Sequence, residues 1–303
     1  MRPWTWTLAW DSSERSHGAL KFVRWLAKTA RSDALRFCTV HVVESTGAAD
    51  GTAARSCAEG ELTADLRRFG LEDVVQAPLF LEGPGAAEAL HSWAKSGETD
   101  GLILGRGHEG GASWTSLGDI GRRFVQDLPV PTFVVPADYT APRDAIGPVV
   151  AGLRDDASAW MVVGFADWIA TLVGAGRIAM HAEPSPAHLP GGVYPPVDPR
   201  AYALHHENEC TRARADLAEV VHAHAHPDDE LVCRPGASPV GVARLAEERD
   251  ASIVVCEVTT EPRVEHVVLT SVGPQVAAQS HAPTLLVPRD WPRAGDWPWA
   301  QPR

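Results

Sequence analysis

The chain has 303 residues, of which 45% are hydrophobic and 22% charged, an ordinary globular composition that excludes wholesale disorder and a fibrous repeat. At roughly 150 residues per domain, this length favours two domains. The formal net charge of -12 argues against a nucleic-acid partner, because phosphate binding needs a basic face.

The first half of the chain alternates short apolar strands with helices. Apolar residues recur at helical spacing in the first of these helices, at positions such as Leu20, Val23 and Ala27. Such alternation indicates a parallel sheet with helices on both faces. We expect strands near 4–10, 36–43, 73–81, 101–105 and 132–135, and helices near 14–31, 55–69, 85–97 and 118–127.

The pattern then occurs a second time, in the same order. The clearest match is between PTFVVP at 131–136 and PTLLVP at 283–288. Four further pairs match: TLAWDSS at 7–13 with VAGLRDD at 150–156, TVHVVES at 39–45 with AMHAEPS at 179–185, GPGAAEAL at 83–90 with RPGASPVGVARL at 234–245, and DGLILG at 100–105 with ASIVVC at 251–256. We therefore expect two copies of one fold, over 1–140 and 147–289, joined by a short linker.

A tail follows the second copy. Residues 290–303 are rich in tryptophan and proline, and the prolines forbid a continuous helix. We expect this tail to pack back onto the body or onto a partner.

A ligand of such a sheet would bind outside the carboxyl ends of the strands, where the strand order reverses. Asp11 directly follows the first strand, and a glycine-rich segment, GRGHEGGASWTSLGD at 105–119, follows the fourth. Glycines let backbone amides approach an anion closely, and the helix starting near Gly118 adds the positive end of its dipole. Ordinary loop chemistry without a ligand is the alternative explanation.

With these features in place, the chain resembles a tandem member of the universal stress protein family over about residues 4–136 and 148–288. The resemblance implies two tandem α/β domains, each with a five-stranded parallel sheet of order 3-2-1-4-5, packed as a pseudo-dimer. Some members bind ATP and others bind no nucleotide. ATP-binding members have an aspartate after the first strand and a Gly-x-x-Gly pair, followed after a loop by Gly-Ser or Gly-Thr.

The first copy matches this motif in part. The resemblance implies a nucleotide site at Asp11, Val42, Gly105, Gly107, His108, Gly110, Gly118 and Asp119, with ATP as the cofactor and Mg²⁺ only alongside ATP. Two of these depart from the motif: His108 replaces the second glycine, and Asp119 replaces the Ser/Thr. A histidine is bulkier than glycine, while the charge of Asp119 repels phosphate and suits a helix N-cap. Arg106, Arg122 and Arg123 would offset that charge in part.

The second copy has lost the motif. Arg154 stands where Asp11 stands in the first copy, and the segment after its fourth strand contains no glycine before Gly273. We expect no nucleotide of the usual kind there. In the family the last strand often mediates pairing, so 132–135 and 284–287 are the candidate edges for intramolecular pairing or a homodimer.

The other clusters of histidine and cysteine residues in the sequence have structural explanations. The histidines of HAHAH at 222–226 follow a helical run and fit a fraying helix end, with metal binding as the alternative. Five cysteines without CxxC spacing indicate neither a disulfide framework nor a zinc ribbon. Neither a nucleophile elbow nor a Walker A sequence is present, and no catalytic residue is assigned.

The favoured hypothesis is a stress-response regulatory or binding protein that binds ATP through the first copy only. Two alternatives remain: a ligand-free protein-interaction module with degenerate pockets, in which Trp114 or His108 fills the crevice, and a slow nucleotide hydrolase that uses Asp119. The N-terminal segment lacks the apolar region of a signal peptide, and the apolar run 160–176 is interrupted, so we expect a cytoplasmic protein without a membrane partner.

Overall fold

The computed structural model of the chain describes most of its residues. These are residues 2–30, 34–44, 48–76, 78–83, 85–107, 117–143, 145–154, 159–183, 199–224, 229–235, 238–258, 272–289 and 291. All statements below concern these residues.

One continuous sheet of ten strands runs through the molecule, in the order β3-β2-β1-β4-β5-β10-β9-β6-β7-β8. Each half therefore has the predicted order 3-2-1-4-5. The first half contains β1 (Trp4–Ala9), α1 (Glu14–Thr29), β2 (Leu35–Glu44), α2 (Ala48–Phe69), β3 (Leu79–Gly83), α3 (Ala86–Lys95), β4 (Gly101–Arg106), α4 (Gly118–Gln126) and β5 (Thr132–Pro136). The second half contains β6 (Val149–Leu153), α5 (Ala159–Val173), β7 (Arg177–Glu183), α6 (Pro199–His224), β8 (Glu230–Pro235), α7 (Ser238–Glu248), β9 (Ile253–Val258), α8 (Val272–Gln279) and β10 (Thr284–Pro288).

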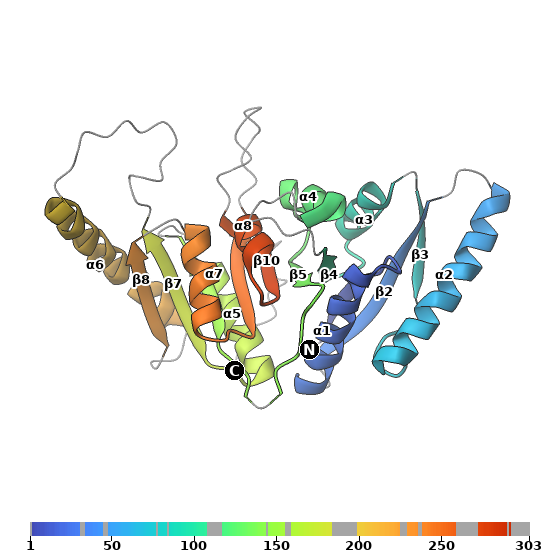
Figure 1. Cartoon of the computed structure of the whole chain (residues 1–303), viewed down its shortest axis with the longest axis horizontal. Helices are drawn as coiled ribbons and strands as arrows, with labels where there is room; N and C mark the ends of the chain where they lie inside the picture. The colour runs from blue at the N-terminus through green and yellow to red at the C-terminus, as the bar shows by residue number, and fades with distance from the viewer. Residues whose placement is uncertain are drawn as a thin grey trace.

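The two halves join at the centre of this sheet, where β5 and β10 lie side by side (Figure 1). They pair antiparallel, and Phe133 lies directly opposite Leu285. Every other strand pair is parallel, so the antiparallel pair marks the pseudo-twofold axis. The predicted intramolecular pairing of the last strands is confirmed. Because these edges are joined to each other, β3 and β8 are the outer edges of the sheet among the described strands.

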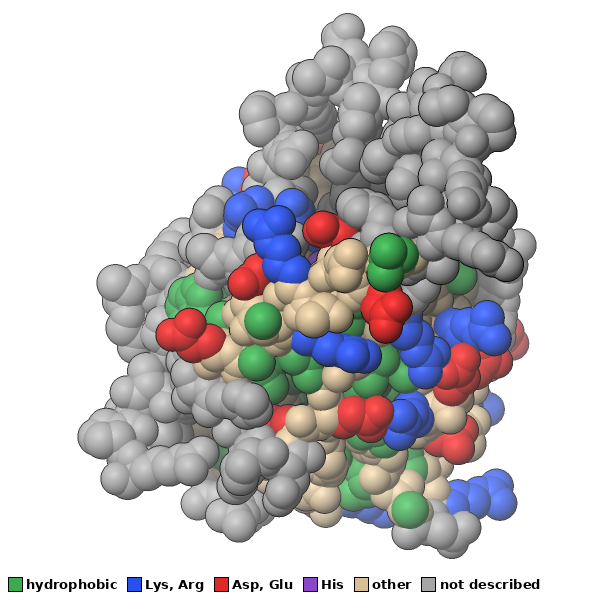
Figure 2. All heavy atoms as spheres, turned by 90° about the vertical axis from the view of Figure 1, so that its left-hand side faces the viewer, with side chains coloured by type: hydrophobic (Ala, Val, Ile, Leu, Met, Phe, Trp, Pro, Cys, Tyr) green, Lys and Arg blue, Asp and Glu red, His purple; other side chains and the backbone are tan. Residues whose placement is uncertain are grey.

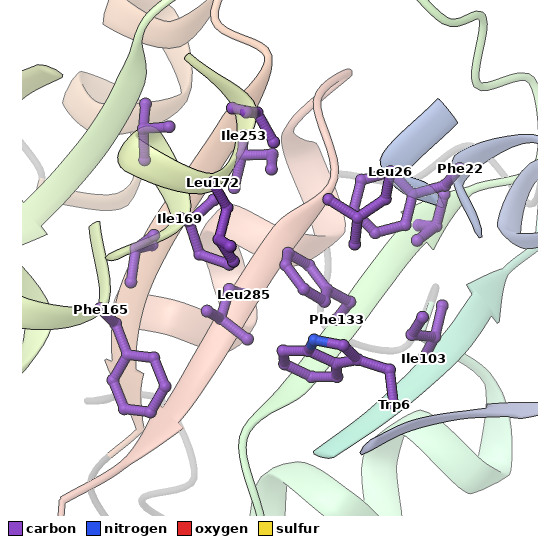
Figure 3. Packing of buried hydrophobic residues seen from close by; sticks show 14 of the residues in the cluster. Trp6, Phe22, Leu26, Ile103, Phe133, Phe165, Ile169, Leu172, Ile253 and Leu285 are labelled. Carbon is purple, nitrogen blue, oxygen red and sulfur yellow. The ribbon is translucent and has the colours of Figure 1, made fainter. Parts of the chain in front are cut away.

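Helices cover both faces. One face of the sheet carries α1, α2, α5 and α6, which pack on a single core that spans both halves. On the other face, α3 and α4 cover the first half of the sheet. The second half of that face is covered by α7 and α8. The shared core is aromatic at the junction, where the rings of Trp6 and Phe133 lie 4.8 Å apart, near Leu285 (Figure 3). All three side chains are fully buried. The hydrophobic effect therefore holds the two halves together, and the short antiparallel ladder fixes their register.

The third strand begins later than the sequence predicts, at Leu79 rather than at residue 73. The reason is the end of α2, where Gly70 adopts φ +63° and the N–H of Leu71 donates to the carbonyl oxygen of Leu66. This Schellman cap is followed by a turn, and Val75 makes only an isolated bridge to Phe37 before the chain reaches β3. The helix itself starts earlier than predicted, at Ala48.

The apolar run 160–176 forms α5, a helix buried on nearly all sides in the shared core. Among the described helices, none is long and apolar enough to cross a membrane. At the β8 edge, Figure 2 shows positive and negative side chains intermixed on the surface. Two ion pairs involve this strand, Arg249–Glu230 and Arg234–Glu248, and the latter links β8 to α7. Such charges discourage another chain from pairing with an exposed edge.

Candidate functional site

A pocket of about 440 Å³ opens at the carboxyl ends of β1, β2 and β4 in the first half. It lies where the strand order reverses, which is the position that ligands take in open parallel sheets. Its wall comes from the ends of these strands and from the first turns of α1, α3 and α4. We call it the Asp11 pocket, and its polar lining includes Asp11, Arg15, His41, Glu44, Glu88 and Asp119.

Asp11 organises the turn between β1 and α1. Its Oδ1 accepts hydrogen bonds from the hydroxyl of Ser13 at 2.6 Å, the amide of Ser13 at 3.1 Å and the hydroxyl of Ser16 at 2.7 Å. Between them Ser12 is held at φ +57°, a left-handed conformation that is strained for serine. Among the described residues, Oδ2 accepts no such bond, so only one oxygen of this pocket-lining carboxylate holds the turn.

Arg15, in the first turn of α1, is the one Lys or Arg among the described residues that line the pocket, and the sequence motif did not indicate it. Its side chain runs past the start of the glycine-rich loop. A Cβ built on Gly107 would lie 3.0 Å from its Nε, and one on Gly118 would lie 3.7 Å from its Nη1. The guanidinium thus lies between the loop that leaves β4 and the first residue of α4. A ligand phosphate at that place would meet a planar, permanently charged donor.

The two motif glycines that the pocket contains have separate structural reasons. A Cβ on Gly105 would lie 2.2 Å from the carbonyl oxygen of Arg15, so only glycine lets the start of α1 pack on the end of β4. Gly118 has φ +71°, which L side chains rarely adopt. Both glycines shape the pocket because they bring the first turn of α1 and that of α4 together.

His41 forms part of the wall at the end of β2. Its Nδ1 lies 2.9 Å from the carbonyl oxygen of Trp10, and the two rings are 5.2 Å apart. The equivalent residue of the second half, His181, makes the same contact with the carbonyl oxygen of Leu153 at 3.3 Å. The histidines therefore fasten the first and second strands of each half, which is a structural role independent of a ligand.

Carboxylates of the chain already occupy the helix N-termini that point at the pocket. Glu44, the last residue of β2, accepts a hydrogen bond through Oε1 from the amide of Ala86 at 3.1 Å, in the first turn of α3. Glu88 folds back over the N-cap residue of the same helix, with Oε2 3.2 Å from a Cβ built on Gly85. A helix N-terminus attracts anions, and here the protein supplies them itself.

The carboxylate of Asp119, at the start of α4, likewise has a partner within the chain. Its side chain is 85% exposed and pairs with Arg122 in the next turn. The prediction that Asp119 is the N-cap is wrong, because the helix begins at Gly118 and Leu117 is the N-cap residue, without a side-chain hydrogen bond. Arg106, expected to offset this charge, instead donates a hydrogen bond to the carbonyl oxygen of Ala277 in the second half.

The structure thus brings five of the predicted residues to one pocket. Asp11, Val42, Gly105, Gly118 and Asp119 all line it. Gly107 lies beside the pocket residue Arg15, since a Cβ built on this glycine would lie 3.0 Å from Nε of Arg15. His108 and Gly110, and Trp114 with them, fall outside the described residues. Among the lining residues that the motif did not predict are four polar ones that come mainly from helix N-termini: Arg15, Ser16, Glu44 and Glu88.

The second half presents a different surface at the equivalent place. Ala9 pairs with Leu104 in β4, whereas its counterpart Gly152 pairs with Cys256 in β9. The counterpart of Gly105 is therefore Glu257, one residue later than the sequence alignment of DGLILG with ASIVVC predicts. Glu257 is buried, with Oε1 3.7 Å from Nε of Arg289. A buried carboxylate thus stands where the first half has a glycine.

The other predicted constellations assemble no site among the described residues. α6 ends at His224 in the HAHAH segment, and His226 lies outside the described residues. The described part of the chain contains no group of three potential metal ligands. All five cysteines are free, and Cys210 is buried beside Ala213 and Cys233. Trp291, at the start of the tail, packs against two of the cores.

Comparison with known proteins agrees with this architecture. Residues 146–288 match the universal stress protein family. Among solved structures, a universal stress protein from Archaeoglobus fulgidus DSM 4304 is 14% identical with a TM-score of 0.63, covering 94% of this chain and 98% of its own. A functionally unknown protein from Pseudomonas aeruginosa PAO1 is equally similar, at 14% identity and a TM-score of 0.63, covering 94% of this chain and 92% of its own. At these identities the likeness shows the fold alone. No curated protein matches the chain.

Proposed function

The second half of the chain belongs to the universal stress protein family, and from this premise we propose that the protein is a cytoplasmic stress-response regulator that binds an adenine nucleotide in the Asp11 pocket of its first half. The juxtaposition of Asp11 and Arg15 in that one pocket carries the proposal. A carboxylate oxygen suits the hydroxyls of a ribose, and a guanidinium suits a phosphate. The five free cysteines are in keeping with a reducing compartment.

The size and apolar wall of the pocket support a ligand of this kind. Its volume of about 440 Å³ lies within the range of small-molecule sites. Val42, Leu90 and Leu104 supply apolar surface beside the polar groups. A flat base would bury against this wall while the ribose and phosphate face Asp11 and Arg15.

The charges of the pocket favour a short phosphate chain over a triphosphate. Asp11, Glu44, Glu88 and Asp119 line it with four negative charges, and Arg15 is the one Lys or Arg among its described lining residues. The loop 108–116, HEGGASWTS, contains neither lysine nor arginine. Repulsion between like charges grows with each added phosphate, so we expect AMP to bind more tightly than ATP, and Mg²⁺ to narrow the difference.

The test is calorimetry of the purified full chain with adenosine, AMP and ATP, each with and without Mg²⁺. We expect one site per chain and tighter binding of AMP than of ATP. Asp11→Ala should abolish binding of all three ligands, whereas Arg15→Ala should reduce the affinity for AMP to that for adenosine. Asp73→Ala, which removes an exposed carboxylate at the turn after α2, is the matched control and should bind like the wild type.

An absence of binding at millimolar concentrations of all three ligands would overturn this proposal and leave the alternative of a ligand-free interaction module. Turnover of ATP is the third hypothesis from the sequence, and it depends on Asp119. No observation favours it, because that carboxylate is exposed and paired with Arg122.

A further inference from the structure

A second cleft lies at the opposite end of α1, away from the Asp11 pocket. It has a volume of about 660 Å³ and lies between the outer face of α1, the end of α2 and the linker that joins the two halves. Its described lining contains four cations and no carboxylate. We call it the basic cleft, and its cations are Lys21, Arg24, Lys28 and Arg143.

The four cations converge from two separate segments. Lys21, Arg24 and Lys28 are spaced by three and four residues, which places them on one face of α1. Arg143 comes from the linker, more than a hundred residues later in the sequence. Among the described residues, none of the four forms an ion pair with a carboxylate.

This arrangement costs stability unless an anion neutralises it. Like charges at i,i+3 and i,i+4 destabilise a helix, and the helix dipole compensates only Lys28, in the last turn. Some exposed arginines of this acidic protein are paired, as Arg55 is with Glu59 and Arg67 with Glu72, whereas Arg36, Arg68 and Arg214 are exposed and form no ion pair with a described carboxylate. What distinguishes the basic cleft is that four such cations line one concave surface.

The remainder of the lining adds donors and an apolar wall. The hydroxyl-bearing side chains of Thr29 and Thr140 flank the cations, and Trp25 and Phe69 form apolar wall. The guanidinium of Arg24 lies over Gly70, with Cζ 3.6 Å from a Cβ built on that glycine, so the charged group is positioned at the end of α2. The hydroxyl of Thr140 already donates to the carbonyl oxygen of Asp138 at 3.3 Å. The two guanidinium groups suit phosphate oxygens, and four positive charges suit a ligand with several phosphates.

We propose that the basic cleft is a second binding site, which takes a small polyphosphorylated anion. It is independent of the nucleotide proposed for the Asp11 pocket. A ligand there contacts α1 and the linker together, so it ties the first half to the segment that leads into the second. Soluble polyphosphates and the phosphate headgroups of lipids share the phosphate chemistry of such a ligand. We assign the basic cleft to a soluble polyphosphate because the site is a cleft at the linker.

The experiment is calorimetry of the full chain with inorganic tripolyphosphate at two salt concentrations. We expect one site per chain on the basic cleft, with affinity that falls as salt rises. The double variant Arg24→Gln/Arg143→Gln should lower the affinity at least tenfold. A second double variant, Lys21→Gln/Arg143→Gln, leaves the Arg24–Gly70 packing intact and should do the same. Arg55→Gln, which removes an exposed arginine of α2, is the matched control and should bind normally.

Several outcomes would overturn the proposal. These are no binding of tripolyphosphate, equal binding by the wild type and both double variants, or loss of binding in Arg15→Ala instead, which would place the anion in the Asp11 pocket. Co-sedimentation with phosphatidylglycerol vesicles, without binding of tripolyphosphate, would assign the cleft to a lipid surface and also overturn it. Thermal melts of every variant establish that each is folded.

Discussion

Arg106, the last residue of β4, donates a hydrogen bond from its guanidinium to the carbonyl oxygen of Ala277 in α8, and so joins the two halves beside the central strand pair. Burial lowers the pKa of this guanidinium, and the nearby charge of Asp138 raises it. The side chain that was expected to offset the charge of Asp119 is thus part of the junction between the halves.

Replacing Arg106 by methionine should therefore weaken the junction. The apolar stem would be kept, but the carbonyl oxygen of Ala277 would lose its donor, at a cost of about 1.5–3 kcal/mol in the free energy of unfolding. Urea denaturation measures this change. The control is Arg122→Met, which removes an exposed pair with Asp119 and should cost less than about 1 kcal/mol. Equal losses in both variants would contradict the assigned role of Arg106.

Two glycines of the first half allow a sharper test of packing. A Cβ on Gly105 would lie 2.2 Å from the carbonyl oxygen of Arg15, and backbone cannot move aside as a flexible side chain can. We expect Gly105→Ala to destabilise the protein by about 1–3 kcal/mol or more, measured by thermal unfolding. Gly60→Ala, in the exposed interior of α2 with no atom within 4 Å of the new Cβ, should instead stabilise by about 0.5–1 kcal/mol. A harmless Gly105→Ala would mean that α1 does not pack so closely on β4.

The sequence predicts the fold well because the repeated segments have the same structural role in each half. The PTFVVP and PTLLVP segments became the paired central strands, and Phe133 meets Leu285 across the axis. The alignment of β4 with β9 is wrong by one residue, because both segments are uniformly apolar and only the strand ladders show that Glu257 matches Gly105.

The candidate site is predicted less completely than the fold. Asp11 and Gly118 follow from strand ends and glycine spacing, which are local features. Arg15 and Glu44 could not be predicted in the same way, because their positions near the pocket depend on how α1 and α3 pack against the sheet. No short motif marks an arginine in the first turn of a helix as a pocket residue.

The end of α7 offers a stabilising substitution. Asp250 has φ +48°, and the N–H of Ala251 donates to the carbonyl oxygen of Ala246, which is the cap that Gly70 provides at the end of α2. Glycine adopts this left-handed conformation without steric cost, so Asp250→Gly should raise the free energy of unfolding by about 1 kcal/mol. Chemical denaturation measures this free energy of unfolding. Gly70→Ala is the opposite control, and we expect it to lower the free energy of unfolding by about 1 kcal/mol. A loss of stability in Asp250→Gly would show that the aspartate side chain has a role of its own.

The cysteines should differ in reactivity according to their burial. Cys256 is 1% exposed in β9, and burial raises the pKa of its thiol to about 12, so almost no thiolate exists at pH 8. Cys57 is exposed on α2. Iodoacetamide at pH 8, followed by peptide mass spectrometry, should therefore modify Cys57 within minutes and leave Cys256 untouched. In urea above the unfolding midpoint both should react, because the thiol of Cys256 then regains its ordinary pKa. Modification of Cys256 in the folded protein at the rate of Cys57 would mean that β9 is accessible to solvent, contrary to its place between β10 and β6 in the sheet.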